Sequence, residues 1–252
     1  MDERVEVARA WRAAIPAGSA ARPRLLLHTG ATSLADARRL AALAVELAMD
    51  GVLVSAPPVY RAPDIETHCE SIAAALGPLS GTAIPAFYYH FPSLYNDDLP
   101  LPEMVAALRE RCPNIVGAKL SGVRDMAVVR ALSALEGFAV IATGVGALAT
   151  RPRGWICYPW EAAAARQLVA TEGVTSAETA KGTVLDALRT EVIARRLPSR
   201  PGAYQISAEK PFMSAWSGIE VGPCRLPLPT AAKLQFGPLL DDFAARGLLR
   251  RP

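Results

Sequence analysis

The stretch Asn114-Ile-Val-Gly-Ala-Lys-Leu120 is a short apolar run that ends near a lysine, and similar runs recur along the chain. Continuous apolar runs of this length are typical of strands that are buried on both faces of a parallel sheet. The other runs are Arg24–Thr29, Asp50–Ser55, Ile84–His90, Gly137–Thr143 and the shorter Gly154–Tyr158. Longer amphipathic segments separate them, as in repeated βαβ units. The sequence therefore predicts an α/β fold, either an open doubly wound sheet or a (β/α) barrel.

The segments between these strands carry apolar residues at helical spacing. The first predicted helix is Asp2–Ala14, and Thr32 or Ser33 is expected to cap the second. The helices that follow cover residues 34–49, 64–76, 102–111 and 124–135, whereas Pro92–Leu99 is expected to be a loop. Beyond Tyr158 the pattern becomes entirely helical, over residues 159–171, 175–196, 207–217 and 229–248, with a turn at Pro198–Gly202.

Composition and charge exclude several classes of protein. The chain has 252 residues, of which 51% are apolar and 20% charged, and its net charge is +3. No basic stripe interleaved with aromatic residues occurs, so no nucleic acid partner is expected. No signal peptide is recognised, and no apolar run approaches the ~20 residues that span a membrane. The four cysteines and three histidines lack metal-ligand spacing, so we expect reduced thiols, a cytoplasmic location and no metal.

Lys119 is the strongest candidate for chemistry, because ligands of such sheets bind at the C-terminal ends of the strands. A lysine that points into a barrel mouth is desolvated, and desolvation lowers the pKa of an amine. A neutral amine can attack a carbonyl carbon and form a Schiff base. The alternative is a lysine that extends from the strand end into solvent, and spacing alone favours that alternative.

Two adjacent tyrosines end a neighbouring predicted strand. Side chains alternate along a strand, so only one of Tyr88 and Tyr89 faces the barrel interior. A phenol beside an imine can relay protons, although a buried aromatic residue with a satisfied hydroxyl is the simpler interpretation. His28 lies at another strand end and is a weaker candidate, and His68 is expected to be a surface or packing residue.

Five segments carry a resemblance to a known family. They are His28-Thr-Gly-Ala-Thr-Ser-Leu-Ala-Asp-Ala-Arg-Arg-Leu40, Ser55-Ala-Pro-Pro-Val-Tyr60, Tyr88-Tyr-His-Phe-Pro92, Gly117-Ala-Lys-Leu-Ser121 and Gly222-Pro-Cys-Arg-Leu-Pro-Leu228. In this order they resemble the third strand with its helix, the fourth strand end, the tyrosine motif, the Schiff-base lysine motif and the C-terminal helical extension of the N-acetylneuraminate lyase / dihydrodipicolinate synthase family. The tyrosine and lysine motifs together reverse the preference for a solvent-exposed Lys119.

The resemblance implies a TIM-type barrel, incomplete at about six of eight strands, over residues 1–160, with a final barrel helix and C-terminal helical region over 161–252. It implies that Lys119 forms an imine with pyruvate or a related 2-oxo acid, and that Tyr89 transfers a proton in the aldol or retro-aldol step. Ser121, Tyr60, Thr143 and Gly144 are the expected substrate-binding residues. The reaction requires no cofactor, the second substrate is an aldehyde, and the family implies a homo-oligomer, either a dimer or a tetramer.

Three departures from the family pattern bear on activity. Met1-Asp-Glu-Arg4 resembles the start of a helix that normally follows two further strands and a carboxylate-binding turn, so we expect an upstream start or a decayed gene. After Thr143 the sequence Gly144-Val-Gly-Ala147 lacks the acidic pair that binds sugar hydroxyls, which argues against sialic acid as substrate. Leu94 stands where dihydrodipicolinate synthases usually have an arginine, which argues against that reaction.

Three functions therefore remain open. The first is a lyase or aldolase with an unidentified aldehyde partner. The second is a catalytically impaired relative that binds a small 2-oxo acid or sugar acid. The third is a structural subunit whose exposed strand edges are completed by a partner chain.

Overall fold

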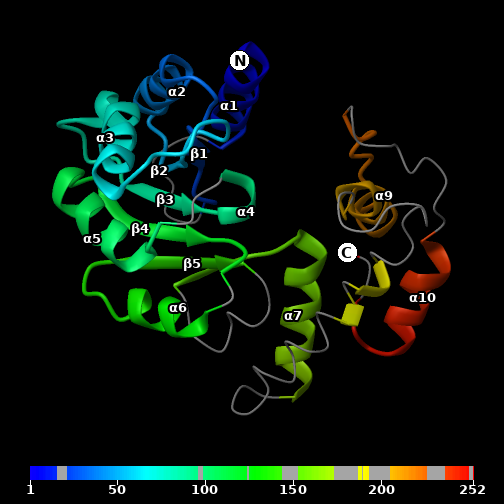
Figure 1. Cartoon of the computed structure of the whole chain (residues 1–252). Coiled ribbons are helices and arrows are strands. Elements are labelled where there is room, and N and C mark those ends of the chain that lie inside the picture. Colours follow the sequence, from blue (N-terminus) through cyan, green and yellow to red (C-terminus); the bar gives the residue numbers. More distant parts are fainter. Residues whose placement is uncertain are drawn as a thin grey trace. The chain divides into compact units, whose positions relative to one another are not determined.

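A computed structural model describes residues 1–15, 22–95, 99–123, 125–143, 153–172, 187–188, 190–192, 205–225, 236–249 and 252. The chain divides into two compact units, Met1–Ile156 and Cys157–Pro252. The first unit contains the sheet, the described elements of the second are helices, and each unit is described by itself (Figure 1). The turn expected at Pro198–Gly202, and most of the helix expected at 175–196, lie outside the described residues.

The first unit is built on a parallel sheet with strand order β1-β2-β3-β4-β5-β6. Its strands are β1 (Leu26–His28), β2 (Gly51–Val54), β3 (Ala86–His90), β4 (Ile115–Leu120), β5 (Ala139–Thr143) and β6 (Gly154–Ile156). A doubly wound sheet reverses its strand order at one point, whereas a barrel adds each strand beside the last. The sequential order therefore confirms a (β/α) barrel, and because β1 and β6 do not pair within the described residues, the barrel is incomplete.

The helices of this unit follow the predicted segments. They are α1 (Asp2–Ala14), α2 (Leu34–Glu46), α3 (Ile65–Leu76), α4 (Pro92–Tyr95), α5 (Leu101–Arg111) and α6 (Met126–Ser133), with a short 3-10 helix at Gly77–Leu79. Ser33, not Thr32, caps α2, since its hydroxyl oxygen accepts a hydrogen bond from the Asp36 amide at 3.1 Å. The predicted loop Pro92–Leu99 was wrong in its first half, which is α4. Proline at the first position suits a helix start, because its fixed φ is already helical.

The core lies on the outer face of the sheet, where α2, α3 and α5 cover the strands (Figure 1). Alternate strand residues such as Val54, Tyr88 and Ala118 are fully buried there. They pack with helix residues such as Leu40, Ile72 and Leu108. Burial of each large apolar side chain contributes about 1.5–3 kcal/mol. The outer face is therefore the part of the sheet that stabilises the unit.

The second unit has its own aromatic core. Its described helices are α7 (Pro159–Glu172), α9 (Gln205–Ser217) and α10 (Gly237–Ala245). The ring of Phe212 lies edge-on to Trp160 at 5.2 Å and to Phe236 at 5.3 Å. The Trp160 indole donates a hydrogen bond to Glu209 at 3.0 Å, which satisfies a donor that is buried with its ring.

Candidate active site

The candidate site lies on the inner face of the sheet, at the C-terminal ends of β3 and β4. The arrowheads of β3, β4 and β5 point the same way, so these ends meet at one edge (Figure 1). Tyr89 is the register partner of Lys119, and Lys119 is the partner of Ile141. Side chains of residues paired in register project from the same face of a sheet. These inner-face residues are half-buried, in contrast to the fully buried outer face.

Lys119 and Tyr89 are in direct contact. The Lys119 amine nitrogen lies 3.3 Å from the centroid of the Tyr89 ring, on its face. An ammonium group over an aromatic face is attracted by the ring quadrupole. The contact holds the amine beside the phenol, next to the strand end where a substrate would bind.

Three aromatic rings hold Tyr89 in place. His28 from β1 and Tyr95 from α4 lie edge-on to it at 5.7 Å and 5.5 Å, and Phe91 lies at 6.1 Å. Such edge-on arrangements are the favoured geometry of aromatic pairs. These rings come from β1, from α4 and from the residue after β3. Together they restrict the orientation of the Tyr89 phenol relative to Lys119.

Two residues with hydroxyl groups, Ser121 and Thr143, lie at the ends of β4 and β5. The Ser121 hydroxyl donates a weak hydrogen bond to the Tyr89 hydroxyl oxygen at 3.5 Å, and the Ser121 amide donates to the carbonyl of His90 at 2.9 Å. The Thr143 hydroxyl donates to the carbonyl of Leu120 at 3.2 Å. The structure thus brings Tyr89 and Ser121 together with Lys119, and places Thr143 at the end of the adjacent strand.

His28 is more closely associated with the site than its sequence position indicated. Burial, together with the nearby positive charges of Arg4 and Lys119, lowers the pKa of His28 to about 4, so the imidazole is neutral near pH 7. Arg4 of α1 donates hydrogen bonds to the backbone carbonyls of His28 and Gly30. A β-carbon at Gly30 would lie 2.9 Å from the imidazole and 2.2 Å from the Ser55 hydroxyl, so any larger residue would displace these two side chains.

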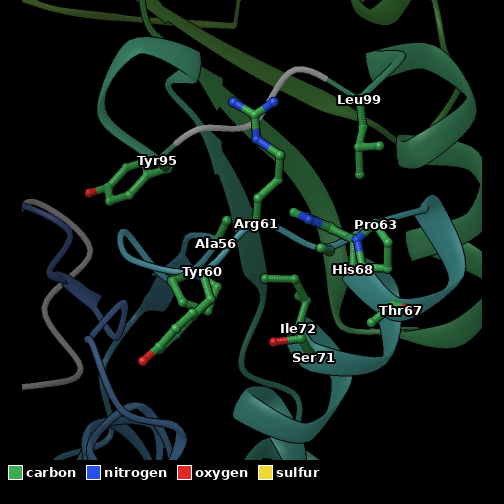
Figure 2. Close-up of a pocket in the computed structure, with 12 residues that line it drawn as sticks. Ala56, Tyr60, Arg61, Pro63, Thr67, His68, Ser71, Ile72, Tyr95 and Leu99 are labelled. Carbon is green, nitrogen blue, oxygen red and sulfur yellow. The ribbon is translucent and has the colours of Figure 1, made fainter.

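Two expected site residues lie apart from this cluster. Tyr60 is 77% exposed and makes no hydrogen bond or ring contact with Lys119, Tyr89 or Ser121 in the described part of the chain. It lines a pocket of about 200 Å3 beside the start of α3 (Figure 2). Gly144 lies outside the described residues.

The other candidate side chains belong to the outer face. Tyr88 is fully buried and its ring lies edge-on to His68 at 5.5 Å. His68 is therefore a packing residue of α3 and not a surface residue. His90, two residues beyond Tyr88, is also buried on this face. Of the two tyrosines, Tyr89 is the one that faces the lysine, because successive side chains of a strand point to opposite faces of the sheet.

The described residues include no group of three or more His, Cys, Asp or Glu side chains that could hold a metal ion. None of the helices seen in the described ranges is both long and apolar enough to cross a membrane. The Lys119 amine is a group that can attack a carbonyl carbon, and the Tyr89 hydroxyl is a group that can exchange a proton.

Residues 2–149 match the model of the dihydrodipicolinate synthetase family. The chain belongs to this family. Its members are class I pyruvate-dependent aldolases and lyases that form a Schiff base, and include N-acetylneuraminate lyases and dihydrodipicolinate synthases. The family match covers the first unit almost completely, which is the unit that contains Lys119 and Tyr89.

Individual members of the family resemble the chain to different extents. The chain is 25% identical to N-acetylneuraminate lyase of Danio rerio over 239 residues, which are 90% of this chain and 74% of that protein. It is 30% identical to the human N-acetylneuraminate lyase over 123 residues, 48% of this chain and 36% of that protein. The segment matched to the human protein therefore covers about a third of that relative.

Solved structures of the family share the fold. N-acetylneuraminate lyase of Proteus mirabilis superposes with a TM-score of 0.76 at 22% identity, over 98% of this chain and 82% of that chain. The lyase of Aliivibrio salmonicida gives a TM-score of 0.77 at 20% identity, over 99% of this chain and 81% of that chain.

Proposed function

We propose that the chain is a Schiff-base-forming lyase or aldolase that acts on pyruvate or a related 2-oxo acid, with Lys119 as nucleophile and Tyr89 as proton carrier. The observation that carries the proposal is the 3.3 Å contact between the Lys119 amine and the Tyr89 ring at the end of paired strands. Membership of a family of pyruvate-dependent aldolases supports it.

In the proposed reaction the Lys119 amine attacks the ketone carbon of the 2-oxo acid, and the resulting hydroxyl leaves as water with a proton from Tyr89, which gives a protonated imine and the Tyr89 phenolate. The phenolate takes a proton from the carbon next to the imine, and the electron pair of that C–H bond forms the enamine. The enamine carbon attacks the aldehyde carbon, and the new alkoxide takes the proton from the Tyr89 hydroxyl. Water then adds to the imine and returns a proton to the Tyr89 phenolate, which releases the product and restores the amine. Cleavage follows the same steps in reverse.

The remaining expected site residues have binding roles in this proposal. Ser121 orients the Tyr89 hydroxyl through the 3.5 Å hydrogen bond. Thr143 and Gly144 bind substrate oxygen atoms at the end of β5, and Tyr60 contributes from the loop after β2. Assembly as a homo-oligomeric dimer or tetramer and a cytoplasmic location remain predictions, as does the absence of a cofactor.

Borohydride trapping tests the proposal. The purified chain is incubated with pyruvate, reduced, and mapped by peptide mass spectrometry. We expect a reduced adduct on Lys119 that is absent from Lys119→Ala. The control is Lys210→Ala, which removes a lysine of the second unit whose amine makes an exposed hydrogen bond, and it should leave the amount of adduct unchanged. A folded chain that binds pyruvate without forming the adduct would instead support the impaired, binding-only relative.

A further inference from the structure

The end of β1 has two backbone carbonyls that face away from the rest of the sheet. The Thr29 amide bonds toward β2, where it donates to the carbonyl of Leu53 at 2.7 Å. The carbonyls of His28 and Gly30, one residue before and one after Thr29, point to the other side of the strand. Within the described part of the chain β1 pairs with β2 alone, so no strand offers donors on that side. Such an edge needs another partner for its carbonyls.

Arg4 of α1 is the partner of both carbonyls. One guanidinium nitrogen donates to the carbonyl of Gly30 at 3.0 Å, and the other donates to the carbonyl of His28. Arginine presents its donors as a planar fork of fixed spacing, whereas a lysine amine is a compact point charge. Arg4 is half-buried, and burial lowers its pKa, although a guanidinium remains charged near pH 7. The contact therefore uses both the shape and the charge of arginine.

His28 connects this end of β1 to the reactive pair. Its ring lies edge-on to Tyr89 at 5.7 Å, and the Tyr89 ring lies 3.3 Å from the Lys119 amine. The Nε2 atom of His28 is buried and has no hydrogen-bond partner among the described residues. Because no hydrogen bond at Nε2 holds the imidazole there, its position depends on packing and on where the backbone of β1 is fixed. Arg4 fixes that backbone.

The charge of Arg4 acts on the same ring. In the described chain the charged and titratable groups that face His28 are Arg4 from α1, Lys119 from β4, Tyr89 from β3 and Tyr95 from α4. A protonated imidazole would place a second charge beside the Lys119 ammonium and would bury a donor without an acceptor. Burial and the two cations lower the pKa of His28 to about 4, which keeps the ring neutral against Tyr89.

We propose that Arg4 is a positioning residue of the candidate active site: its guanidinium fixes the end of β1, and His28 there holds the Tyr89 ring against the Lys119 amine. The inference rests on the proposed aldolase function and adds a residue of α1 to it. Without the guanidinium, water replaces it at the carbonyls of His28 and Gly30, and the imidazole is free to move from Tyr89. Misplacement of a reacting group by about 1 Å can slow a reaction about 100-fold.

Exchange of the pyruvate methyl protons in D2O tests the proposal without an aldehyde, because it requires only the imine and proton transfer at the adjacent carbon. Proton NMR follows the exchange. We expect Arg4→Ala to slow it at least about tenfold, and Arg4→Lys, which keeps the charge and loses the fork, about threefold. The control Arg12→Ala should slow it less than about twofold, because this arginine of α1 bonds to Ala48 and Asp50, before the start of β2.

A double-mutant cycle separates positioning of Tyr89 from a general loss of structure. In the Tyr89→Phe background Arg4→Ala should slow the exchange less than about twofold, since the hydroxyl that it positions is already absent. Equal slowing in both backgrounds, or no slowing by either Arg4 variant in the parent, would overturn the proposal. If circular dichroism shows that Arg4→Ala does not fold, the cycle is run with Arg4→Lys, whose effect should likewise disappear in Tyr89→Phe.

A second measurement does not depend on turnover. NMR of the parent should show contacts between the ring protons of His28 and Tyr89. We expect Arg4→Ala to weaken these contacts and to raise the pKa of His28 from about 4 toward the ordinary 6.5, and Arg4→Lys to raise it less, because the charge is kept. Unchanged contacts in a folded Arg4→Ala chain would overturn the proposal. Absence of the pyruvate adduct on Lys119 is a separate result that refutes the aldolase function, and the ring contacts then still decide whether Arg4 positions Tyr89.

Discussion

Tyr88 and Tyr89 are consecutive residues of the same type, yet they lie in different environments. Tyr88 faces outward, is fully buried, and packs against His68 of α3. Tyr89 faces inward, is half-buried, and covers the Lys119 amine. The difference arises from the period of two along β3, which sends successive side chains to opposite faces. The two faces of the sheet therefore differ in role: the outer face stabilises the unit, and the inner face holds the groups that we propose react with substrate.

The largest expected effect is on stability, at the outer tyrosine. Replacement Tyr88→Ala removes a fully buried ring from the core and should lower the free energy of unfolding by about 3–5 kcal/mol. The matched change Tyr89→Ala removes a half-buried ring and should cost less than half as much. Urea denaturation followed by circular dichroism measures both. Equal losses would show that the two faces contribute alike to stability and would break the comparison.

The next effect is on catalysis, at the inner tyrosine. Replacement Tyr89→Phe keeps the ring against Lys119 and removes the hydroxyl that transfers the proton in the proposed reaction, so kcat should fall about 100-fold while the pyruvate adduct still forms. The control is Tyr88→Phe, which should leave kcat within about threefold. A similar fall in both variants would assign the effect to packing, and no fall in Tyr89→Phe would remove Tyr89 from the reaction.

Local sequence patterns predicted the strands and the inner-face pair well. The apolar runs predicted all six strands, and their ends identified Lys119, because both depend on residues that are neighbours in the chain. The alternation showed that only one tyrosine faces inward, but the family resemblance was needed to choose Tyr89. That choice depends on register with β4, which a single strand does not reveal.

The parts that sequence reasoning missed depend on contacts between distant segments. His28 received little weight, because its neutral state depends first on burial by distant segments and then on the charges of Arg4, 24 residues away in α1, and of Lys119. Tyr95 was assigned to a loop, and the turn of α4 that directs its ring to Tyr89 was not expected. For His28, the position at the end of a predicted strand was the one sequence signal that pointed to the site.

A smaller effect is expected at a glycine of the inner face. A β-carbon at Gly117 would lie 2.2 Å from the backbone oxygen of Ala139 and 2.7 Å from the Phe87 ring, so Gly117→Ala should cost about 2 kcal/mol through forced displacement of β5. Gly154→Ala is the control, because its nearest atom, Cγ1 of Ile141, lies at an ordinary contact distance of 3.4 Å. Thermal unfolding of both variants measures the difference. A neutral Gly117→Ala would mean that the inner face tolerates added volume, in contrast to the closely packed outer face.

The smallest effect is the pH dependence that His28 gives to stability. The ordinary pKa of histidine is 6.5, and His28 in the folded chain has a pKa of about 4. Between these values the unfolded chain binds a proton that the folded chain does not, so stability falls as the pH falls from 6.5 toward 4. We expect a loss on the order of 1 kcal/mol between pH 7 and pH 5, measured by urea denaturation at each pH and absent from His28→Asn.

The Arg22 guanidinium holds the pKa of Asp50 well below its usual range, and that carboxylate is therefore protonated in the folded chain only at pH values below this window. Equal pH dependence in the parent and in His28→Asn would show that His28 is protonated as readily in the folded chain as in the unfolded chain, and that the inner face is wetter than its packing against Tyr89 implies.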